Sequence, residues 1–168
     1  DALKKSRNIP TIKISKNIGF EIIEKKLAEY IPEIKRPLKE YPSQLLGAVE
    51  LSLSEIAIIY KKFITKVCHS EGRSSISVLS NPNETTLKRV VKKPLNEMKF
   101  FGKTGTSNSG LDSWFIGFDG KLLSISWFGV DGDRSNKYLR IGGATSSFKI
   151  FQSYLIKSGK RLNLLNCN

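Results

Sequence analysis

Hydrophobic residues recur at helical spacing in two segments of the first half of the chain. In IGFEIIEKKLAEYI, residues 18–31, apolar residues return every three or four positions until Pro32 interrupts the pattern. In SLSEIAIIYKKFITKV, residues 52–67, Ser52 and Glu55 have the spacing of a capping box, and residues 53–59 are mostly apolar. The pattern predicts two helices, and the apolar run predicts that the second helix is buried.

The segments around these helices show no such periodicity. Residues 1–8 read as the end of a helix that leads to Pro10. A connecting stretch is expected between the two predicted helices, because it is marked by Pro32, Pro37 and Pro42.

Apolar residues after Gly110 predict a β-hairpin. The segments DSWFIGF and KLLSISWFGV, residues 112–118 and 121–130, read as two strands joined by Asp119-Gly120, a dipeptide typical of two-residue hairpin loops. A loop of that length pairs Phe118 with Lys121, Ile116 with Leu123 and Trp114 with Ile125.

The hairpin has two apolar faces. One face carries Trp114, Ile116, Leu123, Ile125 and Trp127. The other carries Phe115, Leu122 and Phe128 with small residues between them, where a helix can approach closely. A final helix at about residues 144–157 aligns Ala144, Phe148, Phe151 and Leu155. These patterns predict an α+β fold with an antiparallel β-sheet and helices on both faces.

Lys103, Thr104, Gly105 and Thr106 come directly before the hairpin, so we expect them to end a neighbouring antiparallel strand. Alternation places Lys103 and Gly105 on one face, and the glycine lacks a side chain that would keep a ligand off the strand. A peptide can bind along such an edge through backbone hydrogen bonds. The Lys103 cation, with the hydroxyl and N–H of Thr106, suits a peptide carboxylate and an oxyanion. A pattern as short as Lys-Thr-Gly also arises by chance.

Ser6-Arg7-Asn8 supplies a hydroxyl and an amide two residues apart, at the expected helix-to-loop boundary. A serine there can relay a proton, and an asparagine can hold a substrate amide. The alternative is that Ser6 and Asn8 are ordinary loop or capping residues, which the triplet by itself favours.

Composition narrows the possible functions. The net charge of +13 favours anionic partners, but Lys and Arg are spread along the chain without a nucleic-acid-binding motif, so a solvated basic surface is the simpler explanation. Two cysteines, Cys68 and Cys167, and one histidine, His69, exclude a Cys/His zinc cluster and argue against a Ser-His or Cys-His catalytic pair. We expect no metal, no cofactor and no nucleic acid. The sequence also lacks an apolar run of about 18 residues.

Four stretches taken in order resemble the bifunctional (class A) penicillin-binding proteins, most closely the 1B type. They are SRNIPTIKISKNIG, PSQLLGAVELSLSEIA, GKTGTSNSGLDSWFIGFDGKLLSISWFGVD and GGATSSFKIFQSYL, and they cover most of the chain. In this family a Ser-x-x-Lys motif carries the acylated serine, and Ser-x-Asn and Lys-Thr-Gly-Thr motifs follow it. Ser6 and Asn8 match the second motif, and residues 103–106 match the third.

The resemblance implies roles for these residues. Ser6 would take part in proton transfer, Lys103 would support that relay, and Asn8 would bind a substrate amide. Thr106 would grip the carboxylate of D-Ala-D-Ala or of a β-lactam, on a substrate-binding strand shared with Thr104 and Gly105. The implied fold is the penicillin-binding and serine β-lactamase-like transpeptidase fold, incomplete in this chain.

The family's nucleophile motif precedes Ser-x-Asn, and this chain begins five residues before Ser6. Its only Ser-x-x-Lys string runs from Ser146 to Lys149, after the third motif, and both residues lie away from the apolar stripe of the predicted final helix. We therefore expect the nucleophile outside this chain. The chain also departs from the family in a short stretch over residues 68–101, and in NETTLK where a Gly-Thr-Gly turn is usual.

Three readings follow from these observations. In the first, residues 1–168 are the C-terminal portion of a transpeptidase domain, whose parent crosslinks peptidoglycan through an acyl-enzyme. The second is a non-catalytic wall-binding or scaffold module, and the third is a serine β-lactamase relative. Similarity that continues beyond the motifs favours the first reading over the third.

The first reading also implies partners and a location. Stem peptides, β-lactams and other cell-wall synthesis proteins would be the partners. The parent would lie at the extracytoplasmic (periplasmic) face of the bacterial inner membrane. It would be held there by an N-terminal anchor that, like the glycosyltransferase domain, is absent from this soluble chain.

Overall fold

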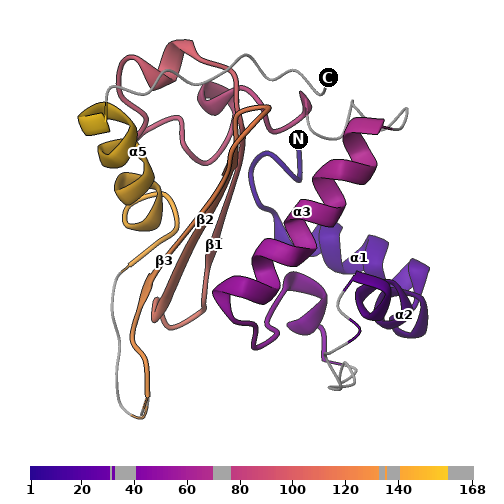
Figure 1. The fold of residues 1–168 in the computed structure, drawn as a ribbon. Coiled ribbons are helices and arrows are strands. Elements are labelled where there is room, and N and C mark those ends of the chain that lie inside the picture. The colour runs from indigo at the N-terminus through magenta and orange to yellow at the C-terminus, as the bar shows by residue number, and fades with distance from the viewer. Residues whose placement is uncertain (31, 33–40, 70–76, 133–134, 136–140, 159–168) are drawn as a thin grey trace. The chain divides into compact units, whose positions relative to one another are not determined.

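The structure is a computed structural model that describes residues 1–30, 32, 41–69, 77–132, 135 and 141–158. The chain divides into two compact units, Asp1–Lys66 and Val67–Asn168, whose elements are drawn in Figure 1. Two residues considered above, Pro37 and Cys167, lie outside the described residues. Across the described ranges, every helix is too short or too polar to span a lipid bilayer.

The first unit is helical. It contains α1 (Asn8–Ile18), α2 (Phe20–Tyr30), the 3-10 helix η1 (Gln44–Leu46) and most of α3 (Leu53–His69). Gly19 separates α1 from α2 with a φ of 93°, a left-handed value that favours glycine. The helix predicted over residues 18–31 is confirmed as α2.

The prediction that residues 1–8 end a helix is wrong. They form a turn in which the N–H of Arg7 donates to the carbonyl of Ala2 at 2.9 Å, and α1 begins at Asn8. Pro10 is the third residue of α1. Backbone N–H groups in the first turn of a helix have no intrahelical partner, so the N–H that proline lacks removes no helical bond.

The capping box predicted for α3 is confirmed. The N–H of Ser52 donates to Glu55 Oε2 at 2.7 Å, and the N–H of Glu55 donates to Ser52 Oγ at 3.2 Å. The expectation that this helix is buried is wrong for its first turns, because Leu53 is 48% exposed and Ile58 41% exposed. Among the described residues of the first unit, only Ile64 is buried.

The second unit holds the sheet. Its elements are the 3-10 helices η2 (Pro82–Glu84) and η3 (Leu95–Glu97), the strands β1 (Phe101–Thr106), β2 (Asp112–Phe118) and β3 (Leu123–Gly129), and α5 (Ser147–Ser158). The strands form an antiparallel sheet in the order β1-β2-β3. The predicted α+β class, the hairpin and the strand before it are confirmed.

The register predicted for the hairpin is wrong by two residues. Phe118 pairs with Leu123, and Trp114 pairs with Trp127. The cause is Asp119, whose Oδ1 accepts from the N–H of Lys121 at 2.9 Å and from the N–H of Leu122 at 2.6 Å, and which thereby closes a four-residue loop. A shift of two leaves every side chain on its predicted face.

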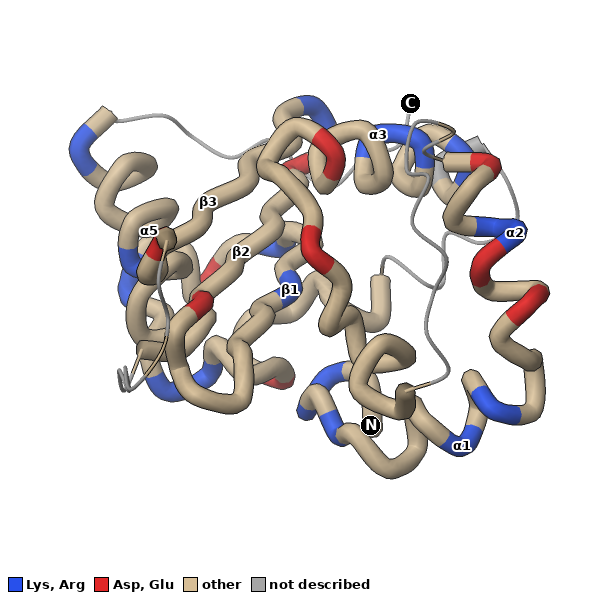
Figure 2. Tube along the Cα trace, turned by 90° about the horizontal axis from the view of Figure 1, so that it is seen from below, with Lys and Arg blue, Asp and Glu red and all other residues tan. Residues whose placement is uncertain are grey.

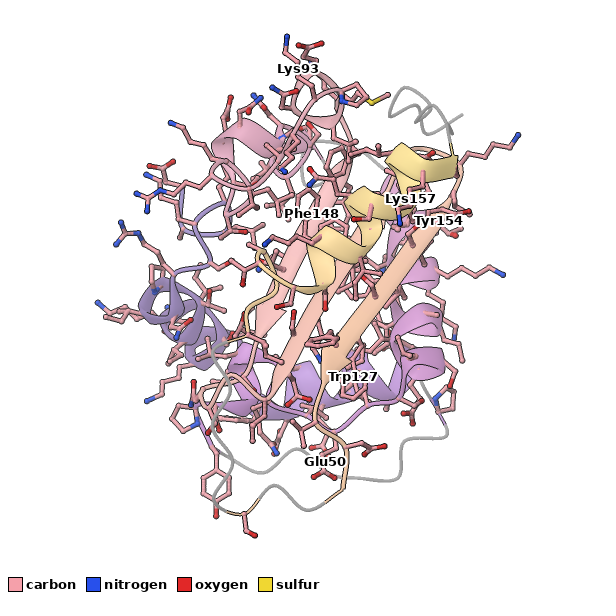
Figure 3. All side chains as sticks on the ribbon, turned by 90° about the vertical axis from the view of Figure 1, so that its left-hand side faces the viewer. Glu50, Lys93, Trp127, Phe148, Tyr154 and Lys157 are labelled. Carbon is pink, nitrogen blue, oxygen red and sulfur yellow. The ribbon has the colours of Figure 1, made fainter. Side chains whose placement is uncertain are left out.

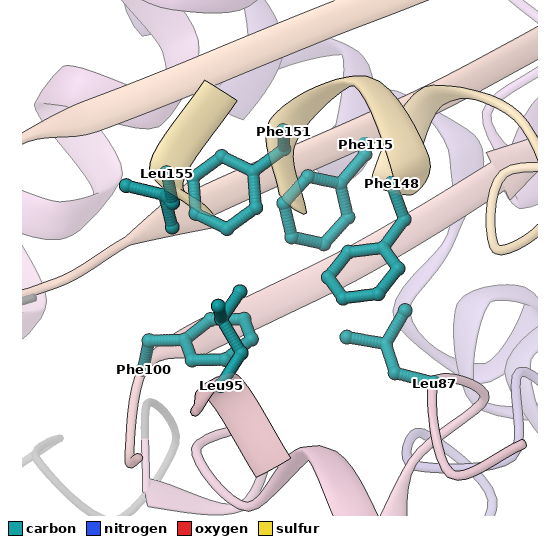
Figure 4. Close-up of a cluster of buried hydrophobic side chains, with 7 residues drawn as sticks. All are labelled: Leu87, Leu95, Phe100, Phe115, Phe148, Phe151 and Leu155. Atoms are coloured by element: carbon teal, nitrogen blue, oxygen red, sulfur yellow. The ribbon is translucent and has the colours of Figure 1, made fainter. Parts of the chain in front are cut away.

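An aromatic cluster joins α5 to one face of the sheet (Figure 4). The ring of Phe115 on β2 lies 5.1 Å from the ring of Phe148 and 4.9 Å from that of Phe151, measured between centroids. Small residues of the sheet allow this approach, because a Cβ on Gly117 would lie 3.3 Å from Phe151. The apolar stripe predicted for the final helix is confirmed, and Figure 3 shows α5 lying across the sheet. The cluster comprises Leu87, Leu95, Phe100, Phe115, Phe148, Phe151 and Leu155.

We expect the two units to differ in local stability. The first unit buries only Ile64 among its described residues, whereas the aromatic cluster lies in the second. Amides of α1 and α2 should therefore be protected from hydrogen exchange at least about 100-fold less than amides of β2, a difference of about 3 kcal/mol in opening free energy. Exchange measured by NMR on the 168-residue chain tests this, and similar protection in both units would contradict it.

Candidate functional site

The structure places the predicted Lys103-Thr104-Gly105-Thr106 motif on β1, at its C-terminal end. Lys103 pairs with Ile116 and Gly105 with Trp114, so these two motif residues share the face of Trp114 and Trp127. By alternation the side chains of Thr104 and Thr106 belong to the opposite face, which α5 covers. The motif therefore contributes to both faces of the sheet and to the edge between them.

The outer edge of β1 is paired only at its beginning, within the described part of the second unit. The N–H of Gly102 points away from β2 and donates to the carbonyl of Leu79 at 3.2 Å. The N–H of Ser107 points toward β2 and donates to the backbone carbonyl of Asp112 at 3.1 Å. Successive residues of a strand direct their backbone N–H and C=O groups to alternate sides. The backbone groups of Thr104 and Thr106 therefore point away from β2, as those of Gly102 do, but further along the strand than the contact with Leu79. An extended peptide could add a strand at this position through main-chain hydrogen bonds.

Lys103 brings its positive charge to the same edge. Its Nζ donates to the outward carbonyl of Thr104 at 2.8 Å. The side chain is half-buried, and burial lowers the pKa of the Lys103 ammonium from its ordinary value of 10.5. A desolvated ammonium attracts a carboxylate more strongly than a hydrated one. A lowered pKa leaves a larger fraction of the amine unprotonated and able to accept a proton near neutral pH.

The Thr104 hydroxyl has a partner that sequence reasoning missed. It lies 2.8 Å from the hydroxyl of Thr86, in the segment that follows η2. The signal available in the sequence is NETTLK, the stretch that departs from the usual Gly-Thr-Gly turn of the family. The hydrogen bond between the Thr86 and Thr104 hydroxyls therefore connects the NETTLK segment to the motif strand β1.

The Thr106 hydroxyl also has a partner that the sequence did not reveal. It accepts a hydrogen bond of 2.9 Å from the N–H of Gly143, which lies just before α5. Thr106 is exposed at the end of β1. The Gly-Gly pair at residues 142–143, within one of the stretches that resemble the family, is the only signal of this contact in the sequence.

Gly105 has a close neighbour on its own face. A Cβ there would lie 3.3 Å from Trp114 Cβ, so the absence of a side chain lets β1 and β2 pack tightly. Its expected role of leaving space for a ligand stays a prediction.

Ser6 and Asn8 lie in the first unit, whereas residues 103–106 lie in the second. Both are exposed; Asn8 is the first residue of α1, and Ser6 in the preceding turn has a φ of 49°, which is uncommon for a residue other than glycine. That these two motifs form one site stays a prediction.

The Ser146-x-x-Lys149 string lies at the start of α5. Lys149 is exposed, whereas the two residues between Ser146 and Lys149, Ser147 and Phe148, are both buried. This agrees with the expectation that Ser146 and Lys149 avoid the apolar stripe.

Charged residues are spread over both units. Figure 2 shows Lys and Arg on the helices of each, with Asp and Glu among them. Within the described ranges, no three His, Cys, Asp or Glu side chains gather in a way that could hold a metal ion.

Comparison with known proteins shows what the chain is similar to. No protein-family model matches it. It is 30% identical to penicillin-binding protein 1B of Buchnera aphidicola subsp. Baizongia pistaciae over 92% of this chain and 24% of that protein. It is 29% identical to penicillin-binding protein 1B of Buchnera aphidicola subsp. Acyrthosiphon pisum over 100% of this chain and 27% of that protein. Penicillin-binding protein 1B of Escherichia coli is 25% identical over 92% of this chain and 21% of its own length.

These comparisons confirm the resemblance drawn from the motifs. The chain is similar to part of a penicillin-binding protein of the 1B type. It spans about a quarter of the length of the curated relatives it matches.

Burial of Lys103 predicts a pH-dependent stability. At pH values between the lowered pKa of Lys103 in the folded state and its ordinary pKa of 10.5, Lys103 carries a proton in the unfolded chain and lacks it in the folded chain. The free energy of unfolding of the wild type, relative to Lys103→Met, should therefore rise with pH across that window.

Urea unfolding at several pH values between 7 and 10.5 measures this difference. Both tryptophans, Trp114 and Trp127, lie in the sheet, so their fluorescence reports on the unit that contains Lys103. A difference that stays constant or falls with pH would show that Lys103 is not desolvated.

Proposed function

We propose that this chain is part of the transpeptidase domain of a class A penicillin-binding protein and that β1 binds the D-Ala-D-Ala end of peptidoglycan stem peptides. The observation that carries the proposal is the edge of β1. There the outward backbone N–H groups of Thr104 and Thr106 lie beside the Lys103 ammonium. The similarity to penicillin-binding proteins 1B supports the same function.

Each group at this edge has a use in binding such a peptide. The backbone of Thr104 and Thr106 would hold the peptide as an added strand. The Lys103 ammonium and the Thr106 hydroxyl would neutralise and hydrogen-bond the terminal carboxylate. A β-lactam carries a carboxylate next to its reactive amide, so the same groups would bind it.

The reaction would proceed through an acyl-enzyme. A serine supplied from outside these 168 residues would attack the carbonyl of the penultimate D-Ala, and the terminal D-Ala would leave with a proton. The amine of a second stem peptide would then attack the ester, form the crosslink and release the serine.

In this scheme the residues of the chain move protons and hold charge. Ser6 would pass the proton of the nucleophile to the leaving amine, with Lys103 supporting the relay, and Asn8 would hold the substrate amide. The lowered pKa of Lys103 suits this role, because a proton relay works best when its pKa values lie near the working pH.

The proposal extends to the parent protein. It would act in peptidoglycan synthesis at the periplasmic face of the inner membrane, carry a glycosyltransferase domain and a membrane anchor, and work with other cell-wall synthesis proteins. The alternative is a non-catalytic wall-binding module. The one Ser-x-x-Lys string of the chain favours that alternative for the chain alone, because it follows the third motif and begins one residue before α5.

The chain by itself should form no covalent adduct with penicillin. Incubation with a fluorescent penicillin, denaturation and electrophoresis should leave this chain unlabelled and label the complete protein that contains it. Stoichiometric label on the chain would refute this, and loss of that label in Ser146→Ala would identify Ser146 as the nucleophile.

In the complete protein, Lys103→Ala should slow acylation by penicillin by a factor of about 100 or more, because a contact made in the transition state is lost. The free energy of unfolding should change by no more than about 0.5 kcal/mol. Lys149→Ala removes an exposed lysine of α5 and is the matched control, with acylation expected at the wild-type rate. Unchanged acylation in Lys103→Ala, or a large loss of stability, would contradict the assignment.

A further inference from the structure

The turn before α5 is fitted closely against the end of the motif strand. A Cβ on Gly143 would lie 2.7 Å from the carbonyl oxygens of Gly105 and Trp114 and 2.8 Å from Thr104 Cβ, where no side chain fits. Only glycine can therefore occupy this position without moving β1 or β2. The close approach lets the Gly143 N–H reach the Thr106 hydroxyl at 2.9 Å.

A buried serine pair holds this turn in place. Ser113 on β2 and Ser147 at the start of α5 are both 0% exposed. The Ser147 hydroxyl donates to the carbonyl of Ser113, and the N–H of Ser147 donates to Ser113 Oγ at 3.0 Å. The Ser113 hydroxyl has two acceptors at 2.9 Å, the carbonyl of Gly142 and Ser147 Oγ.

This network leaves little freedom to the turn. Both buried hydroxyls are satisfied, and Ser126 on β3 adds a bond of 2.9 Å to the carbonyl of Ser147. A fully satisfied buried network fixes one geometry, because any other arrangement leaves a buried polar group without a partner. The position of the Gly143 N–H is thus set by side chains of β2, β3 and α5.

The Gly143 bond determines what the Thr106 hydroxyl can do. The N–H occupies one lone pair of Oγ1, so the hydroxyl's own proton must point in another direction. Thr106 is exposed and ends the strand, so that proton is available to an incoming acceptor. We propose that Gly143, anchored by Ser113 and Ser147, is a positioning residue that holds the Thr106 hydroxyl as a hydrogen-bond donor to the ligand carboxylate. The carboxylate part of this inference rests on the proposed function.

The first test needs no ligand. In the isotope-labelled 168-residue chain, three-bond couplings should show a single χ1 rotamer for Thr106. Ser113→Ala should release the turn and give rotamer averaging at Thr106. Ser124→Ala is the matched control, because Ser124 lies on the same face of the sheet and makes none of these bonds among the described residues. Averaging in the wild type, or a single rotamer in Ser113→Ala, would overturn the proposal.

A second set of variants remains informative if Ser113→Ala fails to fold. Thr106→Val removes the acceptor at an exposed position, so the Gly143 amide proton should move upfield and its shift should become more temperature-dependent. Thr106→Ser keeps the hydroxyl and should preserve both values. An unchanged Gly143 amide in Thr106→Val would show that the bond does not exist in solution.

The ligand arm compares acetyl-D-Ala-D-Ala with its C-terminal amide by NMR titration. Ser113→Ala and Thr106→Val should weaken binding of the acid about tenfold and leave binding of the amide unchanged, whereas Thr106→Ser should bind as the wild type does. Equal effects on the acid and the amide would overturn the carboxylate role. If neither compound binds while Thr106 keeps its network-dependent rotamer, the positioning role stands and the proposed peptide site is wrong.

Discussion

The packing of α5 on β2 is the interaction on which the candidate site depends. The ring of Phe115 lies against Phe148 and Phe151, and this cluster sets the distance between helix and sheet. Burial of each phenylalanine stabilises the fold by about 2–3 kcal/mol. The Ser113–Ser147 pair at the end of the cluster can be fully buried only because both hydroxyls are hydrogen-bonded: the Ser147 hydroxyl donates to the carbonyl of Ser113, and the Ser113 hydroxyl accepts from the N–H of Ser147. The helix therefore supports the strand end that carries Thr106.

The edge of β1 combines two features that a folded protein normally avoids. Outward backbone groups invite another strand, and a half-buried lysine loses hydration energy. Both become useful when the added strand is a peptide that ends in a carboxylate. Its backbone would pair with the edge, and its charge would compensate the ammonium. The outward backbone groups of β1 and the half-buried lysine are unfavourable in the isolated chain, and the same two features would give the ligand its affinity.

The sequence predicted the features that depend on local pattern. The capping box at Ser52, the aromatic stripe of α5 and the place of Lys103 on a strand follow from residues a few positions apart. The hairpin register depended instead on the Asp119 side chain, and α1 was missed because proline is tolerated in a first helical turn. Thr86 and Gly143 could not be found, since they lie 18 and 37 residues from the threonines they contact.

We propose that a carboxylate-ended peptide adds to β1 as a strand. Hydrogen exchange of single amides in the 168-residue chain, with and without acetyl-D-Ala-D-Ala, tests it most directly. The ligand should slow exchange at Thr104 and Thr106, whose N–H groups point outward, and leave exchange at Lys103 and Gly105, which already bond to β2, unchanged. Equal slowing at all four amides, or slowing confined to β3, would contradict it.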